Sequence, residues 1–493
     1  MQQSALKLSI RKTASIMPFE DWGALTTVLA AWLCTVLMSL HLGLYSDDYW
    51  NLFEVNHRSG FGYLSYHLSR INNRYTYALM NKLMHLLFFH PDRLFDSLYI
   101  RASRIVVLTC HFAGVWLAYK SLARIGIPKA GLLVLMPFLS FALFADQALF
   151  WNAAAFAYPV GFFFFAGAVF ALINKRTVLF SVLAFFSLGS TEFVILPLFA
   201  AGTIYAVARL RQRDSLRMRA MVIDASLLLA PFIAWALIVY LTPAAAHREA
   251  RVHGHPKLTV EPLAWAASFF SFYLRQLQPT TWLREHWYFA PGVLLVATAL
   301  LKKTKERLLV LLPAGLYSAS IFPLSAVGYN FYPISHARLW YFPGIFFYIT
   351  AAAALGFIIQ RAPTPQSMRS AKQTTLLAAL LSVIAFGFLC SQTHTITQKG
   401  EEAYGCIRGF LEEIRQDADG RTPSRVELCG MPPALHNFSV FLSPNCGRFA
   451  LALMFHKDRS IPFVYKRQCP KKWGRPWRHS ACPAKSRYKI TYR

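Results

Sequence analysis

Apolar stretches recur along most of this chain and are separated by short polar connections. A helix needs about 20 mostly apolar residues to cross the roughly 30 Å hydrocarbon core of a bilayer. About eleven segments meet or approach that length. They are residues 22–45, 103–122, 131–146, 158–173, 177–190, 193–208, 220–241, 287–301, 308–325, 339–359 and 373–391. The pattern predicts an all-α polytopic membrane protein with about 11 transmembrane helices.

Positive charge is unevenly distributed along the chain, whose formal net charge is +28. In a soluble protein such an excess suggests a nucleic-acid partner. Here the basic residues instead gather on alternate connections between apolar segments, which the positive-inside rule assigns to the cytoplasm. The clusters are Lys7, Arg11 and Lys12; Lys120, Arg124 and Lys129; Lys175 and Arg176; Arg209, Arg211, Arg213, Arg217 and Arg219; Lys302, Lys303, Lys305 and Arg307; and Arg361, Arg369 and Lys372. We therefore expect no nucleic-acid partner and a multi-pass membrane protein whose N-terminus is cytoplasmic.

The same pattern divides the chain into three parts. Residues 1–21 form a cytoplasmic N-terminus, residues 22–391 a transmembrane domain and residues 392–493 a periplasmic C-terminal domain. Long loops at 46–102 and 242–286 fall on the periplasmic side. The first apolar run is too long for a signal-peptide core and has no small-residue cleavage site after it, so we expect it to remain as the first span.

Cysteines and basic residues mark the C-terminal domain. Its cysteines are Cys406, Cys429, Cys446, Cys469 and Cys482. In an exported domain they predict one or two disulfides and at least one free thiol. The absence of a CxxC spacing argues against a zinc site. The basic residues suit anionic headgroups or acidic glycans, or they serve solubility alone.

Two adjacent acidic residues, Asp47 and Asp48, follow the first apolar run. Burial near the hydrocarbon and mutual repulsion both oppose ionisation of such a pair, so one of them is a candidate general base with a raised pKa. Aromatic neighbours such as Tyr49 and Trp50 are typical of juxtamembrane helices. The alternative role is structural, because Asp residues also cap helix N-termini. The two roles are compatible.

Other polar residues stand out in the remaining periplasmic connections. Glu192 lies in a very short connection, where a carboxylate needs either a ligand or an ion-pair partner. Arg338 is the only basic residue of the connection 326–338, and its guanidinium either binds an anionic ligand or simply snorkels to the interface. Tyr329 and His336 lie near it, and Asn152 lies in an earlier connection. These residues are candidate substrate contacts.

Nucleotide-dependent chemistry is not indicated, because no Walker A, GxSxG, HExxH or dinucleotide-binding motif is present. The first loop begins with the motif Asp47-Asp-Tyr-Trp50 and continues to an Asn73-Arg74 element. This layout resembles the GT-C-fold glycosyltransferases, which use polyprenyl-phosphate sugars as donors. It is most similar to the bacterial glucosyltransferases that modify the O-antigen of lipopolysaccharide, over about residues 20–390. The cysteine-containing tail lies outside the resemblance.

The resemblance implies transfer of a sugar from a polyprenyl-phosphate carrier to a glycan or glycolipid acceptor at the periplasmic face, with inversion in most members. Asp47 would be the general base and Asp48 its partner. Arg74 and Arg338 would bind the departing phosphate, and Glu192 would contact the acceptor. Some members use a divalent metal such as Mg²⁺ or Mn²⁺, for which only Asp47 and Asp48 are candidate ligands here. The resemblance also implies a multi-pass protein of the bacterial inner (plasma) membrane, with membrane lipids as further partners.

Two other functions are compatible with these features. A transporter or flippase of a lipid-linked or anionic substrate would also contain charged residues within the membrane, although the sequence shows no internal repeat. An O-antigen polymerase or ligase uses the same carriers, but its large loop typically lies in the second half of the chain.

Overall fold

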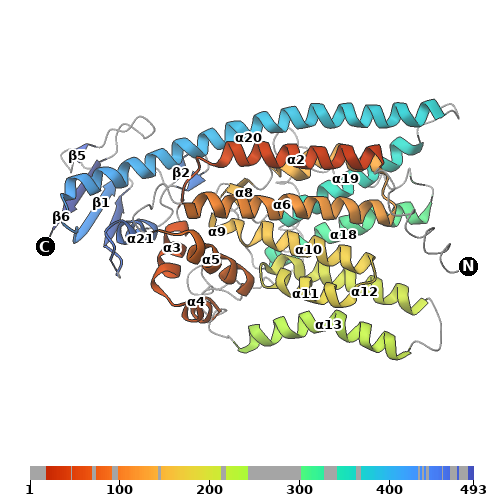
Figure 1. Ribbon diagram of the computed structural model, residues 1–493, viewed down its shortest axis with the longest axis horizontal. Coiled ribbons are helices and arrows are strands. Elements are labelled where there is room, and N and C mark those ends of the chain that lie inside the picture. Colours follow the sequence, from red (N-terminus) through yellow and green to blue (C-terminus); the bar gives the residue numbers. More distant parts are fainter. Residues whose placement is uncertain are drawn as a thin grey trace, which may run out of the picture.

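The computed structural model describes residues 18–45, 47–68, 74–90, 98–142, 146–150, 152–211, 218–241, 301, 303–326, 341–361, 368–430, 434–435, 438–439, 444–457, 459–466, 475–476 and 487–492. These residues are mostly helical. Figure 1 shows an elongated helical bundle with a small portion of mixed helix and strand at one end.

The bundle helices fall in the predicted apolar segments. They are α2 (Phe19–Ser39), α6 (Leu98–Ile125), α7 (Lys129–Phe141), α10 (Tyr158–Ile173), α11 (Thr177–Leu188), α12 (Ile195–Arg211), α13 (Met218–Leu241), α18 (Thr304–Ala326), α19 (Tyr341–Arg361) and α20 (Met368–Ala418). The predicted segment 287–301 lies outside the described residues, apart from Leu301. By length and composition, 4 helices of the described part can cross a membrane, namely Phe19–Ser39, Leu98–Ile125, Tyr341–Gln360 and Thr375–Ala418. Shorter apolar helices are Lys129–Phe141, Tyr158–Ile173, Thr177–Leu188, Ile195–Arg209 and Val222–Ile238.

Large apolar side chains are exposed along the outer helices. On α2, Leu29, Leu33 and Leu37 follow one another at a spacing of one helical turn and are 54%, 49% and 57% exposed. On α20, Leu380 and Ile384 are 55% and 60% exposed. Soluble proteins rarely expose apolar strips of this kind. The bundle is therefore that of a membrane-embedded helical protein.

Two glycines let the inner helices pack closely. Gly114 of α6 lies against Phe162 of α10, and a Cβ added there would be 2.8 Å from that ring. Gly131 of α7 lies against α19, where an added Cβ would be 2.7 Å from the Cα of Gly356. Small residues at such positions bring helix backbones together in a membrane, where packing rather than hydrophobic burial drives association.

One end of the bundle is held by a charged network around Asp21, in the first turn of α2. The Asp21 carboxylate lies 2.8 Å from the ammonium of Lys120 on α6 and 2.7 Å from that of Lys129 on α7. Lys305, at the start of α18, lies at this end too, because a Cβ added at Gly126 would be 3.8 Å from its ammonium. Basic residues from separate predicted cytoplasmic connections therefore meet at one end.

The opposite end carries the helices of the first loop, α3 (Asp47–His57), α4 (Gly60–Tyr66) and α5 (Tyr75–Phe88), as Figure 1 shows. Helices were predicted in this loop, and they are present. On α5, Asn81, Lys82 and His85 are buried, whereas Leu83 and Leu86 are exposed. A helix with an exposed apolar face is typical of a membrane surface. Short elements complete this end: α8 (Asp146–Phe150), α9 (Asn152–Ala155) and the 3-10 helix η4 (Glu192–Val194).

Helix α20 is 51 residues long and continues far beyond residue 391, the predicted end of the last apolar segment. The predicted domain boundary at residue 392 falls inside it, so a continuous helix joins the tail to the bundle. In this extension Ile407, Leu411 and Ile414 are buried at helical spacing. The helix ends before Asp419 and Gly420, whose φ values of 46° and 72° form a left-handed C-terminal cap.

The tail contains a four-stranded mixed sheet in the order β4-β1-β6-β5. Its strands are β1 (Arg425–Cys429), β4 (Phe463–Lys466), β5 (Arg475–Pro476) and β6 (Arg487–Thr491), and β2 (Ala434–Leu435) pairs separately with β3 (Phe438–Ser439). β1 pairs in parallel with β4 and antiparallel with β6. Helix α21 (Pro444–Met454) lies between β1 and β4 in the sequence, as a parallel connection requires. The all-α prediction therefore applies to the bundle and not to the tail.

Candidate functional site

Asp48 is the second residue of α3 and is only 3% exposed. Its Oδ2 accepts a hydrogen bond from the Tyr45 N–H at 2.9 Å, and its own N–H donates to the Tyr45 carbonyl at 2.8 Å. A carboxylate that reaches back three residues in this way forms part of a helix N-terminal cap. Asp48 therefore has the capping role that was the alternative to catalysis, and this role fixes the orientation of its carboxylate.

Four buried tyrosines surround Asp48 closely enough to interact with its charge. They are Tyr45, before α3; Tyr49, on α3; Tyr77, on α5; and Tyr99, on α6. Burial raises the pKa of Tyr45, Tyr49 and Tyr77 above the ordinary value of a phenol, and the Asp48 charge adds to this effect. These hydroxyls consequently stay protonated and remain O–H donors.

Arg104, on α6, brings positive charge into the same cluster. It interacts electrostatically with Asp48, Tyr45 and Tyr404 and is 2% exposed. Its Nη2 donates to the Gly43 carbonyl at 3.5 Å, whereas Nε and Nη1 have no hydrogen-bond partner among the described residues. Arg104 was not predicted as a site residue. The signal was present in the sequence, because arginine is rare and costly inside an apolar segment such as 103–122.

The extension of α20 forms one wall of this cluster. The Tyr45 hydroxyl donates to the Gly400 carbonyl at 2.9 Å. The Tyr404 ring meets the Tyr45 ring edge-on, with 6.4 Å between the centroids, and lies so close to Gly43 that an added Cβ would overlap it. Tyr404 lies in the tail, outside the resemblance, and was not predicted as part of the site.

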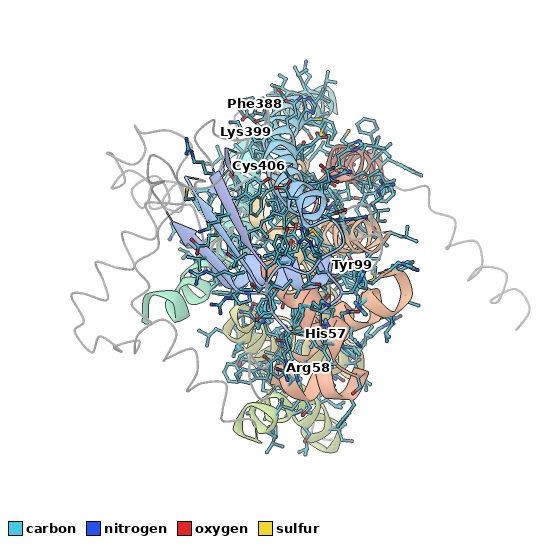
Figure 2. The ribbon with its side chains drawn as sticks, turned by 90° about the vertical axis from the view of Figure 1, so that its left-hand side faces the viewer. His57, Arg58, Tyr99, Phe388, Lys399 and Cys406 are labelled. Atoms are coloured by element: carbon cyan, nitrogen blue, oxygen red, sulfur yellow. The ribbon has the colours of Figure 1, made fainter. Side chains whose placement is uncertain are left out.

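Helix α21 contacts α3 from the tail side. The rings of Phe53 on α3 and Phe449 on α21 lie 4.8 Å apart. Figure 2 looks onto this end of the molecule, and in this view the label of Tyr99 lies between Cys406 of α20 and His57 at the end of α3. The first loop, the start of α6 and the tail therefore meet around Asp48.

Arg74 and Glu192 belong to segments that the structure brings together. Arg74 immediately precedes α5 and interacts electrostatically with Tyr77. The Thr76 N–H, in the first turn of α5, donates to the Gly189 carbonyl at 2.9 Å. Gly189 ends α11, and Glu192 begins η4 just after it. The segment that follows Arg74 is thus docked on the turn that leads to Glu192.

The remaining predicted site residues lie partly or wholly outside the described part of the chain. Asn152 begins α9, and Phe156, just after α9, has its ring centroid 6.5 Å from that of Tyr77. For Asp47, Asn152 and Glu192 the backbone is described but the side chain is not. Tyr329, His336 and Arg338 lie outside the described residues. The expected meeting of Arg338 with the acidic pair therefore stays a prediction.

Buried polar residues of α5 hold the first-loop helices together. The Asn81 amide donates to the Tyr63 hydroxyl of α4 at 3.0 Å and accepts from the Tyr99 hydroxyl of α6 at 2.7 Å. The Lys82 ammonium donates to two carbonyl oxygens at the end of α3, each at 2.7 Å. Burial lowers the pKa of Lys82. The helices that carry Asp48 and Tyr77 are thus fixed relative to each other.

The cluster combines a carboxylate, a guanidinium and several phenolic O–H groups in a buried environment, where electrostatic interactions are stronger than in water. Such an arrangement can orient a hydroxyl group and bind an anionic oxygen. Within the part of the chain that the structure describes, no group of three or more His, Cys, Asp or Glu side chains is suited to a metal ion. A metal at Asp47 and Asp48 stays a prediction, because only the Asp48 side chain is described.

Comparison of the chain with protein-family models finds no match, and comparison with curated proteins finds none either.

Proposed function

We propose that this chain is a membrane glycosyltransferase that moves a sugar from a polyprenyl-phosphate carrier to a glycan or lipid-linked acceptor. The observation that carries the proposal is the burial of Asp48 beside Arg104, at the start of the first-loop helices and at one end of a membrane-embedded bundle. Sugar transfer needs a carboxylate near the acceptor hydroxyl and positive charge near the departing phosphate. The GT-C-like motif that begins at Asp47 supports the same reaction.

In the proposed reaction the acceptor hydroxyl oxygen attacks the anomeric carbon of the donor sugar. The bond between that carbon and the phosphate oxygen breaks, and polyprenyl phosphate leaves with the bonding electrons. Asp47 takes the hydroxyl proton as general base. Asp48 orients the reacting groups, and its bond to the Tyr45 N–H supports this positioning role.

The remaining predicted residues complete the proposed site. Arg74 and Arg338 bind the phosphate, and Glu192 contacts the acceptor. The other proposed substrate contacts are Asn152, Tyr329 and His336. Docking of the segment after Arg74 on the turn before Glu192 supports a site in which donor and acceptor lie side by side. A divalent metal held by the two aspartates would supply positive charge that stabilises the negative charge of the leaving phosphate.

We propose further that about 11 helices span a bacterial inner membrane, with the site at its periplasmic face. Two observations support this orientation. Basic residues gather at the opposite end of the bundle, around Asp21. Cys406 and Cys429 of the tail each take part in a disulfide, as predicted for that domain, and disulfides form in an oxidising compartment such as the periplasm.

A transporter or flippase is the second candidate, because buried charges such as Asp48 and Arg104 also line transport paths in membranes. The fate of the sugar separates the two functions. A transferase releases it from the lipid, whereas a flippase carries the intact lipid-linked sugar across the bilayer. An O-antigen polymerase or ligase would also release the carrier, but it would transfer a whole repeat unit or chain.

The proposal is tested with Asp47→Asn and Asp48→Asn variants, assayed for sugar transfer from a polyprenyl-phosphate sugar in membranes. Both changes keep side-chain size and a hydrogen-bonding group, so we expect normal levels of protein in the membrane. Sugar transfer should fall about 100-fold or more in Asp47→Asn, which loses the general base. Glu412→Gln, on the half-exposed surface of α20, is the matched control and should leave transfer unchanged. Full activity of both Asp variants at normal protein levels would contradict the proposal.

A further inference from the structure

Arg104 is a charged side chain whose hydrogen-bonding capacity is mostly unused. Its single hydrogen bond within the described part of the chain is the 3.5 Å contact from Nη2 to the Gly43 carbonyl. Nε and Nη1, which carry most of its N–H donors, are buried and have no partner there. Buried donors are almost always paired, so an exception of this kind needs an explanation.

Tyr49 provides a second unpaired donor in the buried cluster around Asp48. Its side chain is 0% exposed, and its hydroxyl has no hydrogen-bond partner among the described residues. Tyr49 and Arg104 interact electrostatically with the same three groups, Asp48, Tyr45 and Tyr404. Two unused donor groups therefore lie in the buried cluster around Asp48.

A purely structural ion pair with Asp48 does not account for these donors. A structural arginine–carboxylate pair typically forms two parallel hydrogen bonds. Here the Asp48 Oδ2 already accepts the Tyr45 N–H, and Arg104 Nε and Nη1 have no acceptor in the described residues. The arrangement instead suits a ligand that brings several acceptor oxygens.

We propose that Arg104 and Tyr49 form a buried binding site for a phosphate group. A planar guanidinium presents its N–H groups as a fork that matches phosphate oxygens, and the phenol adds a further donor. That the site binds a phosphate group follows from Arg104 and Tyr49 themselves. That this phosphate belongs to the polyprenyl carrier rests on the proposed function. Arg104 is distinct from Arg74 and Arg338, the two residues that the resemblance suggested for this role.

The charge of Asp48 predicts whether its removal strengthens or weakens phosphate binding. Asp48 lies within electrostatic range of both donors, so its negative charge opposes a bound phosphate. Asp48→Asn removes this repulsion and keeps an oxygen for the Tyr45 N–H. The variant should therefore bind a phosphate ligand more tightly while it transfers sugar more slowly.

The test uses the full-length chain in phosphatidylcholine nanodiscs with farnesyl phosphate as the ligand, measured by calorimetry. Farnesol, inorganic phosphate and phosphatidylglycerol in the nanodisc are the comparison ligands. We expect farnesyl phosphate to bind at least about tenfold more tightly than farnesol, and Arg104→Gln to remove that advantage. Tyr49→Phe should weaken binding several-fold, and Asp48→Asn should strengthen it. Arg101→Gln, an exposed position on the same helix, is the matched control and should change nothing.

Tyr49→Phe also separates binding from folding. It removes an unpaired buried hydroxyl without changing the shape of the side chain, so the ligand-free melting temperature should stay the same or rise. Equal binding of farnesyl phosphate by the wild type, Arg104→Gln and Tyr49→Phe would overturn the phosphate site. Competition by phosphatidylglycerol as strong as that by farnesyl phosphate would overturn its assignment to the carrier.

Different experimental outcomes would overturn the phosphate site and the transferase function. If Asp47→Asn abolishes sugar transfer while the Arg104 variants bind farnesyl phosphate normally, the phosphate site is wrong and the transferase stands. If binding depends on Arg104 but the wild type transfers no sugar from any polyprenyl-phosphate donor, the transferase is wrong and the phosphate site stands.

Discussion

The hydroxyl of Tyr45 donates a hydrogen bond of 2.9 Å to the carbonyl oxygen of Gly400, which lies 355 residues later in the chain. This bond connects the segment that fixes Asp48 to the extension of α20. The N-terminal part of the site is therefore supported by a helix that leads directly into the C-terminal tail. A change in the tail should consequently alter the position of Tyr45 and Asp48.

Tyr45→Phe should lower the free energy of unfolding by about 1 kcal/mol, because it leaves the buried Gly400 carbonyl without its donor. The measurement is thermal unfolding of the protein in nanodiscs, together with sugar transfer, which should also fall. Tyr66→Phe is the control, since the Tyr66 hydroxyl makes only a 3.5 Å contact with Glu54 in a partly exposed position. Equal destabilisation by the two changes would argue against a special role for the Tyr45–Gly400 bond.

Gly189→Ala should displace Tyr75, because an added Cβ would overlap the Tyr75 ring, whose hydroxyl donates to the Phe185 carbonyl at 2.6 Å. We expect a loss of stability of about 1–3 kcal/mol, as for other overpacked positions. Gly387→Ala on α20, with no neighbour within 4 Å, should be neutral or slightly stabilising.

A double variant tests the cause of the Gly189→Ala effect. Adding Tyr75→Ala removes the ring that the new methyl group would strike, so the two changes should cost clearly less together than the sum of their separate effects. Simple additivity would show that Gly189 matters for another reason.

Cys406→Ala should destabilise the tail, because Cys406 is disulfide-bonded and 1% exposed. Loss of a disulfide typically costs about 2–4 kcal/mol. Proteolysis of the tail should become faster, and sugar transfer should fall because Tyr404, two residues away, packs against Gly43. Cys110→Ala, which removes a free thiol on α6, is the control. Unchanged transfer with a tail that is readily cleaved would show that the tail does not support the site.

His85 should make stability depend on pH. Burial, together with the nearby Lys82 charge, lowers its pKa from 6.5 to about 4, and its ring lies 3.2 Å from the Asn56 side-chain oxygen. Between these two pKa values the unfolded chain binds more protons than the folded one, so stability is complete above pH 6.5 and declines as the pH falls toward 4.

His85→Gln tests this dependence, since glutamine keeps a hydrogen-bonding group and does not titrate. Melting temperatures measured between pH 7 and pH 4.5 should fall less steeply for His85→Gln than for the wild type. The difference should reach at most about 1.4 kcal/mol per pH unit. Parallel pH profiles would show that His85 is not the group responsible.

Much of the bundle could be predicted from the length and position of the apolar stretches. The segment 158–173 coincides with α10, which has Pro159 in its first turn and is followed by the polar residues Asn174, Lys175 and Arg176. The first span was predicted to end at residue 45, whereas α2 ends at Ser39. After Ser39 the chain leaves the helix, and Gly43 and Tyr45 pack against the extension of α20. Gly43, for example, lies under the Tyr404 ring.

The tail was harder to predict, because its composition is polar. Its first part nevertheless repeats buried residues at helical spacing, such as Ile407, Leu411 and Ile414. Weighing this periodicity above composition would have extended the last helix past residue 391. The strands of the sheet are short, at most five residues each, and carry little local signal.

The candidate site, too, could be predicted from the sequence only where a local signal was present. Asp48 was predicted because it stands beside an apolar run, which is a local signal. Arg104 and Tyr404 join it through contacts with Gly43 and Tyr45, across separations that no local pattern encodes. A charged residue inside a span was the available signal for Arg104, and no comparable signal marked Tyr404.

The most direct test follows a labelled sugar on a polyprenyl-phosphate donor, with the purified full-length chain in sealed vesicles, acceptor glycan on the site side and no nucleotide. The proposed function predicts that the label moves to the acceptor, that polyprenyl phosphate appears in equal amount, and that Asp47→Asn abolishes both. Label that stays on the lipid, whether the lipid remains in place or crosses the bilayer, would contradict glycosyl transfer, and crossing would identify a flippase instead.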